Sequence, residues 1–369
     1  MNLNKFKYQL TEENIASFPP AIRGNTKMLI VNTKDFYFDR PASDYCEIDT
    51  YGNISKYIPE NSMVVLNDTK VLPTRIRCVN HKNKEIEIMF LENHNNIDFL
   101  EKAIVKGKVK VGHLLKSVED PTIIFEVVNK DDKFISAKVK NNKNILEVLG
   151  KIGNPPIPPY LNRVETEIDF NRYQTIFAEK EGSVAAPTAS LNMTNKILAS
   201  IKSKNVAINY ITLHCGYGTF KPIIQENIKN HDIHEEYFEC PLEVYQQIKQ
   251  FKNNHNSIIA VGTTVTRTLE YLFDKDYISE ANSGKLTGET NLYLYPGKKF
   301  KIVDYLLTNF HAPNSTPILL SSAFFIQKIF PNLKNKEIDI GIEKFLELYN
   351  FALKNNFKFL SYGDSMLIT

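Results

Sequence analysis

The spacing of hydrophobic positions changes twice along this chain of 369 residues. Residues 62–66, "SMVVL", form an apolar run followed by the polar residues "NDTK", which predicts a buried strand and a turn. From about residue 72 to residue 150, alternating segments such as "EIEIMF", "TIIFEVV" and "FISAKVK" are separated by polar turns such as "NHKNK" and "NKDDK". This pattern is typical of a small antiparallel sheet or barrel.

A proline-rich segment ends this region. "GNPPIPPY", residues 153–160, is incompatible with regular structure and predicts a stiff connection. Beyond it, "NVAINYITL" and "SIIAV" have strand patterns, and "PLEVYQQIKQF" between them has a helical one. We therefore predict an α/β main domain, with a barrel-like mixed sheet and helices, over residues 1–71 and 151–369. The small antiparallel β-barrel is inserted at residues 72–150.

Composition predicts a globular protein without a membrane segment. Apolar residues make up 43% of the chain, which is enough for a substantial core. "MNLNKFKYQLTEEN" is too polar for a secretion signal, and "TPILLSSAFF" is too short to span a bilayer. The four cysteines are widely spaced and form no CxxC pair. We expect reduced thiols and a cytoplasmic location.

Positive charge is concentrated in the predicted barrel. The net charge of the chain is only +3, but residues 70–150 contain 15 Lys and Arg against 11 Asp and Glu. Lys106, Lys108 and Lys110 alternate, so a strand would place their ammonium groups on one face. A solvated edge strand is the simpler interpretation. Contact with a nucleic-acid phosphate backbone is the alternative.

The segment "AVGTTVTRTLEYLF" predicts a strand, a turn at Gly262, and a helix capped by Thr263 or Thr264. The prediction places Arg267 in the first turn of this helix. Free backbone amides and a nearby guanidinium would suit a carboxylate or phosphate. An ordinary strand-to-helix turn with an exposed arginine explains this segment equally simply when it is taken alone.

Histidines lie in unusual surroundings in the second half of the chain: His214 in "TLHCGYGTF", His231 and His234 in "HDIHEEYFE", and His311 in "TNFHAPNST". A zinc or iron site is one interpretation. However, His231 and His234 are three residues apart, whereas helical metal ligands usually lie four apart. Structural hydrogen bonds are the simpler explanation for each histidine on its own.

The usual signatures of several enzyme classes are absent from the sequence. It contains no GxSxG, no P-loop, and no GxGxxG after a strand, so a serine hydrolase, a nucleoside triphosphatase and a dinucleotide-dependent dehydrogenase are not indicated. "NDTKVLPTR" is more informative, because Asn67, Asp68 and Arg75 lie at the predicted domain junction, where ligand sites often form.

These segments together resemble one family, the S-adenosylmethionine:tRNA ribosyltransferase-isomerases of queuosine biosynthesis. The resemblance runs through "FKYQLTEENIASFP", "NDTKVLPTR", "RYQTIFA", "SVAAPT", "TLHCGYGTFKPI", "HDIHEEYF", "AVGTTVTRTLE", "YPGKKFKIVD", "LTNFHAPNST" and "FLSYGDSMLI". It covers nearly the whole chain, and it implies an α/β core with an inserted β-barrel.

The resemblance implies a reaction in which the ribosyl part of S-adenosylmethionine moves to 7-aminomethyl-7-deazaguanine at the tRNA wobble position. That ribosyl group is isomerised to an epoxycyclopentane, giving epoxyqueuosine-tRNA, while adenine and methionine leave. The sulfonium acidifies the neighbouring 5′-carbon, so a base must remove a proton in a site shielded from water. An acid must assist the departing adenine. The resemblance implies a monomer and no cofactor or metal beyond the co-substrate S-adenosylmethionine.

The resemblance also implies roles for individual residues. Acid–base or ring-orienting roles fall to His214, His234, Glu236 and His311, and Asp68 and Asp364 would hold a sulfonium, ammonium or ribose hydroxyl. Arg267 would bind the methionine carboxylate, and Tyr173 and Gln174 would contact a purine. The implied substrate-binding residues are Asn67, Arg75, Tyr173, Gln174, Ala186, Pro187, Thr188, Gly216, Gly218, Thr219, Gly262, Thr263, Arg267, Asn309, Ser315 and Asp364. The implied tRNA-binding residues are Arg77, Lys106, Lys108 and Lys110, with Arg75 and Lys82 nearby in the sequence.

The segment "SVAAPTASLNMT" both supports the resemblance and departs from it. Its small residues would let the main chain approach a planar ligand, and Thr194 is expected to cap the following helix. Ser190, Asn192 and Met193 stand where the family usually has Gly, His and Phe. Ala312, Asn314 and Pro317 are the departures in the segment "NFHAPNSTP". Drift in an Asn-rich, Lys-rich sequence is one explanation. A paralogue with another acceptor, such as a free 7-deazapurine, is the alternative.

Overall fold

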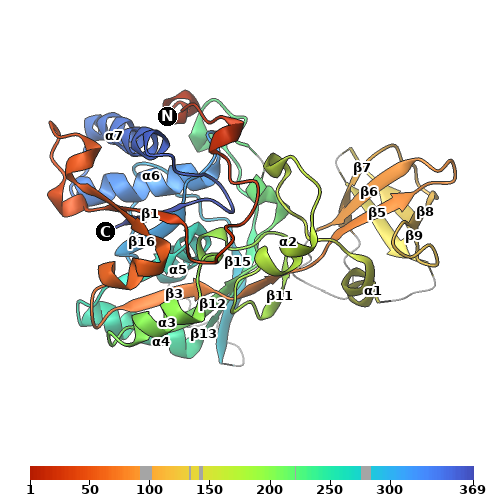
Figure 1. Ribbon diagram of the computed structural model, residues 1–369, viewed down its shortest axis with the longest axis horizontal. Helices are drawn as coiled ribbons and strands as arrows, with labels where there is room; N and C mark the ends of the chain where they lie inside the picture. Colours follow the sequence, from red (N-terminus) through yellow and green to blue (C-terminus); the bar gives the residue numbers. More distant parts are fainter. Residues whose placement is uncertain (92–101, 133, 141–143, 221, 276–283) are drawn as a thin grey trace.

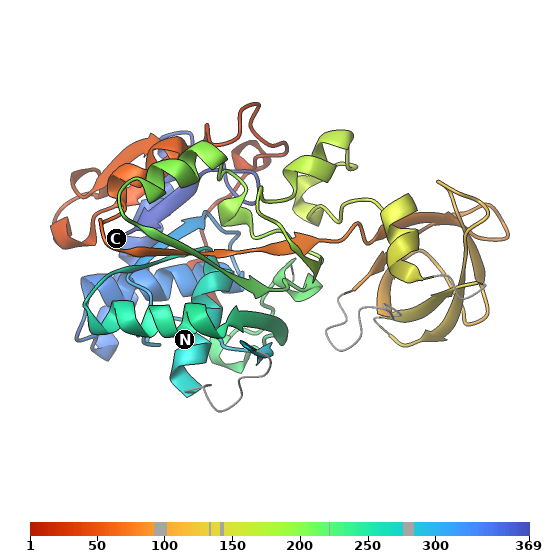
Figure 2. The ribbon, with the colours of Figure 1, turned by 90° about the horizontal axis from the view of Figure 1, so that it is seen from below.

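The computed structural model describes residues 1–91, 102–132, 134–140, 144–220, 222–275 and 284–369. It consists of a large main domain and a smaller barrel that stands away from it on a narrow connection (Figures 1 and 2). Within the described residues, no helix combines the length and the apolar character that a bilayer-spanning segment needs. The mixed sheet and the closed barrel confirm the predicted fold class, an α/β main domain with an inserted antiparallel barrel.

The main domain is built on a nine-stranded mixed sheet. In spatial order the strands are β15 (Lys285–Thr290), β13 (Glu236–Pro241), β12 (Ala207–Leu213), β3 (Met63–Asn67), β14 (Ile258–Val261), β16 (Tyr305–Asn309), β17 (Ser365–Ile368), β1 (Lys27–Val31) and β2 (Cys46–Thr50). The central strands β12, β3, β14 and β16 run parallel. Every residue of β3 and β14 is buried, because helices and loops cover both faces of the parallel part.

Alternate residues of these strands enter two different cores. Val65 and Ala260 belong to the larger core, with apolar residues of α4 (Leu242–Asn253), α5 (Thr263–Lys275), α6 (Thr316–Ile329) and α7 (Asn335–Lys354). Val64 and Ile259 face the other core, with α3 (Asn195–Lys202) and η5 (Tyr51–Tyr57). The predicted cap of α3 is confirmed, because the Thr194 hydroxyl accepts a hydrogen bond from the N–H of Ile197 at 3.2 Å.

Short 3-10 helices connect these elements. They are η1 (Leu3–Phe6), η2 (Glu12–Asn14), η3 (Thr33–Asp35), η4 (Ala42–Asp44), η7 (Pro159–Leu161), η8 (Thr188–Ser190), η9 (Tyr217–Phe220) and η10 (Ile228–Asn230). A two-stranded parallel sheet of β4 (Thr69–Val71) and β11 (Lys180–Ser183) lies where the chain leaves the main sheet. The short α2 (Glu167–Arg172) is on the side of the main domain that faces the barrel (Figures 1 and 2).

The inserted unit is a closed barrel in which all the strand pairs are antiparallel. Its strands are β5 (Arg75–Val79), β6 (Glu85–Phe90), β7 (Lys102–Lys106), β8 (Leu114–Ser117), β9 (Ile124–Lys130) and β10 (Ile135–Val139). Inward residues such as Ile88 and Phe125 fill the interior, and α1 (Ile145–Ile152) packs Leu149 against them. This core extends from Leu72 to Ile152.

The expected strand carrying Lys106, Lys108 and Lys110 is wrong. β7 ends at Lys106, and Lys108 and Lys110 lie in the connection that follows. Gly107 has φ +130°, and a Cβ there would lie 2.5 Å from Cδ1 of Ile86. The chain therefore turns at Gly107, so the three ammonium groups do not share a strand face.

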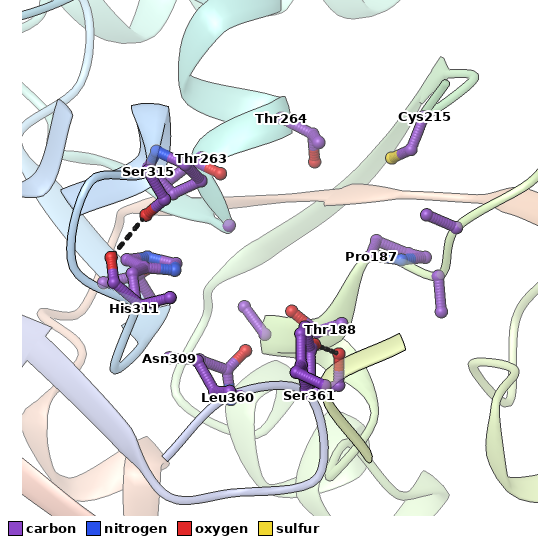
Figure 3. Close-up of a pocket in the computed structure, with 18 of the residues that line it drawn as sticks. Pro187, Thr188, Cys215, Thr263, Thr264, Asn309, His311, Ser315, Leu360 and Ser361 are labelled. Carbon is purple, nitrogen blue, oxygen red and sulfur yellow. Dashed lines mark hydrogen bonds between the residues drawn. The ribbon is translucent and has the colours of Figure 1, made fainter. Parts of the chain in front are cut away.

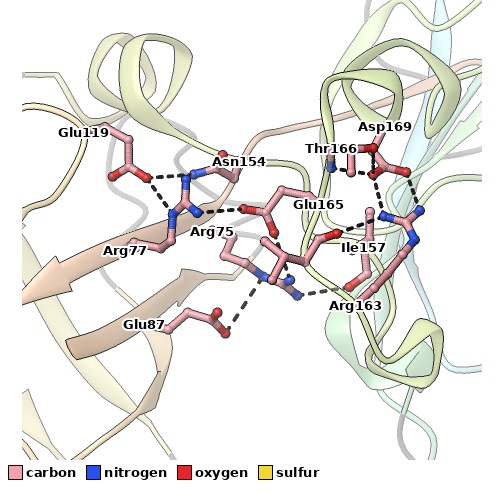
Figure 4. Close-up of polar contacts among 11 residues, drawn as sticks. Arg75, Arg77, Glu87, Glu119, Asn154, Ile157, Arg163, Glu165, Thr166 and Asp169 are labelled. Carbon is pink, nitrogen blue, oxygen red and sulfur yellow. Dashed lines mark hydrogen bonds and ion pairs between the residues drawn. The ribbon is translucent and has the colours of Figure 1, made fainter.

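A cluster of arginines and acids occupies the junction of the two domains (Figure 4). The carboxylate of Glu165, whose side chain is only 4% exposed, lies 3.7 Å from Arg75 Nη1 and 4.0 Å from Arg77 Nη1. Arg77 Nε also donates to Glu119 at 2.8 Å, and Arg75 Nη2 donates to the carbonyl of Ile157 at 3.0 Å. These contacts tie the barrel strand β5 to the segment that returns from the barrel.

A second ion pair lies within that returning segment, and Arg163 Nε also donates to the carbonyl of Ser17 in the main domain at 2.7 Å. Arg163 donates two hydrogen bonds to Asp169, at 2.7 and 2.8 Å, and Tyr362 donates a third at 2.7 Å. Burial by itself would raise the pKa of Asp169, but hydrogen bonds from Arg163, Thr166 and Tyr362 outweigh it and lower the pKa to about 2.

We expect Asp169→Asn to reduce the free energy of unfolding by about 3 kcal/mol at pH 7, because it leaves the buried Arg163 guanidinium without its counter-charge. The folded-state pKa of Asp169 is below the unfolded value of about 3.9. This stabilisation is therefore present above about pH 4 and is lost as the pH falls towards 2. Urea denaturation of both proteins between pH 7 and pH 3 measures the difference.

Asp339→Asn is the matched control, since Asp339 pairs with Lys5 at a site where its side chain is 57% exposed. We expect that variant to lose less than about 1 kcal/mol. Equal losses in the two variants would show that the Arg163–Asp169 pair has no special structural role.

Candidate functional site

A pocket opens at the carboxyl ends of the parallel strands β14 and β16 (Figure 3). Gly262 and Thr263 follow β14, and residues 311–315 follow β16. The carboxyl ends of neighbouring parallel strands meet at one edge of a sheet, which is where α/β proteins commonly bind ligands. The lining residues are Tyr160, Tyr173, Ala185, Ala186, Pro187, Thr188, Ala189, Cys215, Pro222, Gly262, Thr263, Thr264, Thr308, Asn309, His311, Ala312, Pro313, Asn314, Ser315, Pro317, Leu360 and Ser361.

The small residues of "SVAAPTAS" form one wall of this pocket. The wall approaches the start of α5 closely, since a Cβ built on Gly262 would lie 3.6 Å from the Cβ of Ala189. Gly262 has φ +98°, a left-handed conformation that strains other residues. The turn before α5 therefore needs a glycine, and the wall opposite has only small side chains.

His311 is the titratable residue that lines the pocket most directly. Its Nε2 lies 2.8 Å from the hydroxyl of Thr308, and its carbonyl accepts a hydrogen bond of 2.5 Å from Tyr8. Burial lowers the pKa of His311 to about 3. The imidazole is therefore neutral at physiological pH.

Asn309 offers the pocket an acceptor. Its Nδ2 donates to the carbonyl of Asp364 at 3.3 Å, which orients the amide, and its Oδ1 has no hydrogen-bond partner among the described residues. The residue is only 2% exposed, and Figure 3 shows its oxygen directed into the pocket. A buried acceptor without a donor costs about 1 to 3 kcal/mol, so a ligand N–H or O–H at this point would be favoured.

The wall beside Asn309 is strained. Leu360 has φ +71°, which is unusual for a branched side chain. A hydrogen bond of 3.0 Å from its N–H to the carbonyl of Phe310 holds it there. The neighbouring Ser361 shares a short hydrogen bond with the hydroxyl of Tyr160. A segment held in such a conformation is fixed in place before any ligand arrives.

Glu236 and Arg267 line an adjoining hollow, which shares Thr263, Thr264 and Pro317 with the pocket. They form a buried ion pair. The carboxylate also accepts the N–H of Gly216 at 3.0 Å, and Nε of Arg267 donates to the carbonyl of Leu292 at 3.0 Å. Arg267 is the fifth residue of α5 rather than a first-turn residue, so the expected position was wrong by one turn.

His214 and Asp68 lie close to each other in the structure, but neither residue lines the pocket. Nδ1 of His214 lies 2.7 Å from the hydroxyl of Thr69, the residue after Asp68. Asp68 accepts a hydrogen bond of 2.6 Å from Thr212, and burial raises the pKa of its carboxyl group. Gly182 explains how His214 fits, since a Cβ there would lie 2.7 Å from its Nε2.

His234 is exposed, and it packs against Gly218. A Cβ on Gly218 would lie 2.3 Å from Cδ2 of the imidazole, which is too close for any other residue type. Neither residue lines the pocket. The side chain of Thr219 lies outside the described part of the structure.

Three implied ligand residues are instead used within the fold. The side chain of Gln174 exchanges hydrogen bonds with the backbone of Val71, at 3.0 and 2.7 Å. The two carboxylate oxygens of Asp364 accept the N–H groups of Lys27 and Lys358, at 2.7 and 2.6 Å. Arg75 belongs to the domain junction described above. These contacts stand against direct substrate contact by the three side chains.

The sequence prediction missed several lining residues. Thr308, Leu360 and Ser361 lie inside the quoted motifs "LTNFHAPNST" and "FLSYGDSMLI", yet only neighbouring residues were selected there. Tyr160 ends the proline-rich segment, which predicts only a connection. No local signal distinguishes these positions, because they reach the pocket through strand pairing and through the strained turn at Leu360.

The unusual residues of this chain divide into two groups. Asn192 and Met193 are buried away from the pocket, and Met193 packs in the smaller core of the sheet. Ala312, Asn314 and Pro317 line the pocket. Among the described residues, no three His, Cys, Asp or Glu side chains gather as a metal site would require.

The fold and the pocket together describe one class of protein. It is an α/β protein that has an inserted barrel and a ligand site at the carboxyl ends of its parallel strands.

A family model described as "Queuosine biosynthesis protein" matches residues 3–368. The S-adenosylmethionine:tRNA ribosyltransferase-isomerases of Hydrogenobaculum sp. and Chlorobaculum parvum are 40% and 38% identical, with 100% of this chain and 100% of each relative covered. The crystal structure of the S-adenosylmethionine tRNA ribosyltransferase from Thermotoga maritima has a TM-score of 0.52 at 25% identity and covers 99% of this chain and 100% of its own. The chain belongs to the queuosine biosynthesis protein family.

Two buried asparagines provide a test of which polar side chains serve the fold and which serve the pocket. Asn67 makes four hydrogen bonds, to the backbone of Leu213 and Thr69 and to the hydroxyl of Thr264. We expect Asn67→Leu to lower the free energy of unfolding by about 3 kcal/mol, because it leaves buried backbone N–H and C=O groups without hydrogen-bond partners. Asn309→Leu should cost less than about 1 kcal/mol, because it removes one long hydrogen bond and an unpartnered acceptor. Urea denaturation of both variants measures this, and similar losses would contradict the distinction.

Proposed function

We propose that this protein transfers the ribosyl part of S-adenosylmethionine to 7-aminomethyl-7-deazaguanine at the tRNA wobble position and isomerises it. The product is epoxyqueuosine-tRNA, and adenine and methionine are released. S-adenosylmethionine is the co-substrate, and the proposal invokes no other cofactor. We further propose that the protein acts as a monomer in the cytoplasm, where its tRNA substrate is found.

One observation supports this proposal more than any other. The pocket is lined by residues of "RYQTIFA", "SVAAPT", "TLHCGYGTFKPI", "AVGTTVTRTLE", "LTNFHAPNST" and "FLSYGDSMLI", which are six of the motifs that carry the family resemblance. The full-length relatives described above are named for the same activity. Asn192 and Met193 lie away from the pocket, whereas Ala312, Asn314 and Pro317 line it, and no observation connects these substitutions with a small-molecule acceptor.

The pocket suits a nucleoside with a reactive sulfonium. The wall of Ala185, Ala186 and Ala189 permits close approach of a flat ring, and Oδ1 of Asn309 would accept a hydrogen bond from an amino or hydroxyl group. The buried, neutral imidazole of His311 would accept a proton or orient the ribose. Shielding from water favours removal of the 5′-proton, because the resulting ylide is otherwise quenched.

The adjoining hollow would receive the methionine part of the co-substrate. Its apolar residues, including Leu292 and Leu320, suit the methylene groups of that part, and the Glu236–Arg267 pair presents both charges to an amino-acid zwitterion. His214, His234 and Asp68 remain proposed acid–base or orienting groups that would have to reach the substrate from outside the pocket lining.

The proposed activity is tested by incubating the protein with S-adenosylmethionine and tRNA that carries the 7-aminomethyl base. We expect stoichiometric adenine release and a matching mass gain on the tRNA. The control is the same tRNA with guanine at the wobble position, which lacks the nucleophilic amine. Adenine release without tRNA modification would replace the proposal with another acceptor, and absence of turnover would reject it.

We expect His311→Ala to reduce the rate of adenine release by about 100-fold or more, as removal of a proton-transfer group does. Because the pKa of His311 is about 3, its neutral form persists above pH 5, and its titration should not appear in the rate profile between pH 5 and pH 8. His214→Ala and His234→Ala test the other two histidines. Full turnover in both of these variants would exclude them from catalysis.

A further inference from the structure

Two arginines, Arg23 and Arg172, lie close together near the pocket. The guanidinium of Arg23 donates only to main-chain carbonyls, those of Gln174 at 2.9 Å, Leu191 at 2.8 Å and Asn171 at 3.1 Å. Arg172, the last residue of α2, forms no hydrogen bond or ion pair with a described residue, and its Nε is buried without a partner. No carboxylate of the described part of the chain pairs with either.

Such a pair is unfavourable when nothing is bound to it. The guanidinium of Arg23 donates to the carbonyl of Asn171, the residue before Arg172, so the two positive charges are close, and burial lowers the pKa of both arginines. Partly buried cations in proteins are normally paired with an anion. The neighbouring Arg163 follows that rule through its two hydrogen bonds to Asp169.

The carboxylate of Asp169 does not serve this pair. Its oxygens already accept hydrogen bonds from Arg163, from the N–H and hydroxyl of Thr166, and from Tyr362. The two positive charges of Arg23 and Arg172 therefore remain uncompensated within the described structure. An anion from outside would relieve the repulsion between them and would find two guanidinium groups that can donate to it.

The position of the pair connects it with the pocket. Tyr173, which lines the pocket, stands between Arg172 and Gln174 in the chain. The Arg23 guanidinium also holds the carbonyl of Leu191, immediately after η8, whose Thr188 and Ala189 line the opposite part of the site. α2 itself lies on the side of the main domain that faces the barrel (Figures 1 and 2).

Exposed aromatic residues flank the arginines on the same segments. Phe18 is 55% exposed and precedes Arg23, and Phe170 is 47% exposed and lies on α2. The guanidinium of Arg163 lies 4.1 Å from the centre of the Phe18 ring. Exposed rings beside guanidinium groups are the surfaces on which unpaired bases of RNA loops stack.

We infer that Arg23 and Arg172 together bind a backbone phosphate of the tRNA anticodon loop, next to the nucleotide that enters the pocket. The inference rests on the proposed function for the identity of the RNA. A phosphodiester has the single negative charge and the two free oxygens that would bridge two guanidinium groups. In a loop, each nucleotide is directly followed by such a phosphate, so a phosphate site beside the pocket would set the position of the wobble base.

The test uses the full chain, labelled tRNA and a salt series from about 50 to 200 mM. We expect Arg172→Gln to weaken tRNA binding, measured by fluorescence anisotropy, by about tenfold at the low-salt end. It should also reduce the slope of log K against log salt by about 1, because one ionic contact is lost. Arg172→Lys should keep most of the slope, and Arg172→Glu should lower the affinity further than Arg172→Gln.

The matched control is Arg40→Gln, which removes the same charge from an exposed arginine that packs over Tyr37. We expect its tRNA affinity to stay within about twofold of the wild type. Since Arg172 makes no hydrogen bond to the described residues, its variants should keep the wild-type circular dichroism spectrum and unfolding temperature.

Two results would overturn the inference. One is an unchanged tRNA affinity and salt slope in Arg172→Gln and Arg172→Glu. The other is a loss of S-adenosylmethionine affinity, measured by calorimetry, with unchanged tRNA binding, which would make the anion the methionine carboxylate. The proposed function fails separately, when the wild type makes no product. The wild type could bind tRNA with a steeper salt dependence than Arg172→Gln and still release no adenine. That result would support the phosphate site and reject the proposed activity.

Discussion

The pocket depends on the parallel pairing of β14 with β16, in which Ile259, Ala260 and Val261 lie opposite Tyr305, Leu306 and Leu307. This register places the turn at Gly262 and the segment after Asn309 at the same edge of the sheet. Strand side chains alternate between the two faces, so a shift of one residue would exchange the core-facing and opposite-facing positions. The two buried cores hold this register, because neither face can accept the other's side chains without exposing apolar surface to water.

Polar side chains around the site fall into two groups. Some have all their hydrogen bonds satisfied within the protein, and others are available to a ligand. Asn67, Asp169, Gln174 and Asp364 have their polar atoms engaged within the protein, and they hold β3, the returning segment after the barrel, β4 and the end of the chain in place. Oδ1 of Asn309 and the guanidinium of Arg172 lack such partners among the described residues. Because a buried donor or acceptor is costly when unpaired, these two groups are the more informative guides to what binds.

The junction between the domains has a different character. Glu165 stands between two arginines of β5, and Asn154 exchanges two backbone hydrogen bonds with Arg75, at 3.1 and 2.8 Å. The barrel is thus joined to the main domain by charged and main-chain contacts rather than by a shared apolar core, since the two cores have no residue in common. For the proposed tRNA substrate, Arg23 and Arg172 of the main domain lie together at α2, while Arg77 of the barrel is already paired with Glu119.

Local patterns in the amino-acid sequence were enough to predict the secondary-structure elements and the reaction that the family resemblance implies. Hydrophobic alternation indicated the barrel and the α/β core, and motif order indicated the family, because both are properties of residues close together in the chain. The sequence also predicted pocket residues that lie in local turns, such as Pro187, Thr188, Gly262 and His311. Which polar side chains have their hydrogen bonds satisfied within the protein depends on long-range packing. Gln174 and Asp364 are bonded to partners 103 and 337 residues away. The tertiary structure also places the Arg23 guanidinium on the carbonyl of Asn171, next to Arg172, because a contact across 148 residues depends on how the sheet, α2 and the loops pack together, which no local pattern records.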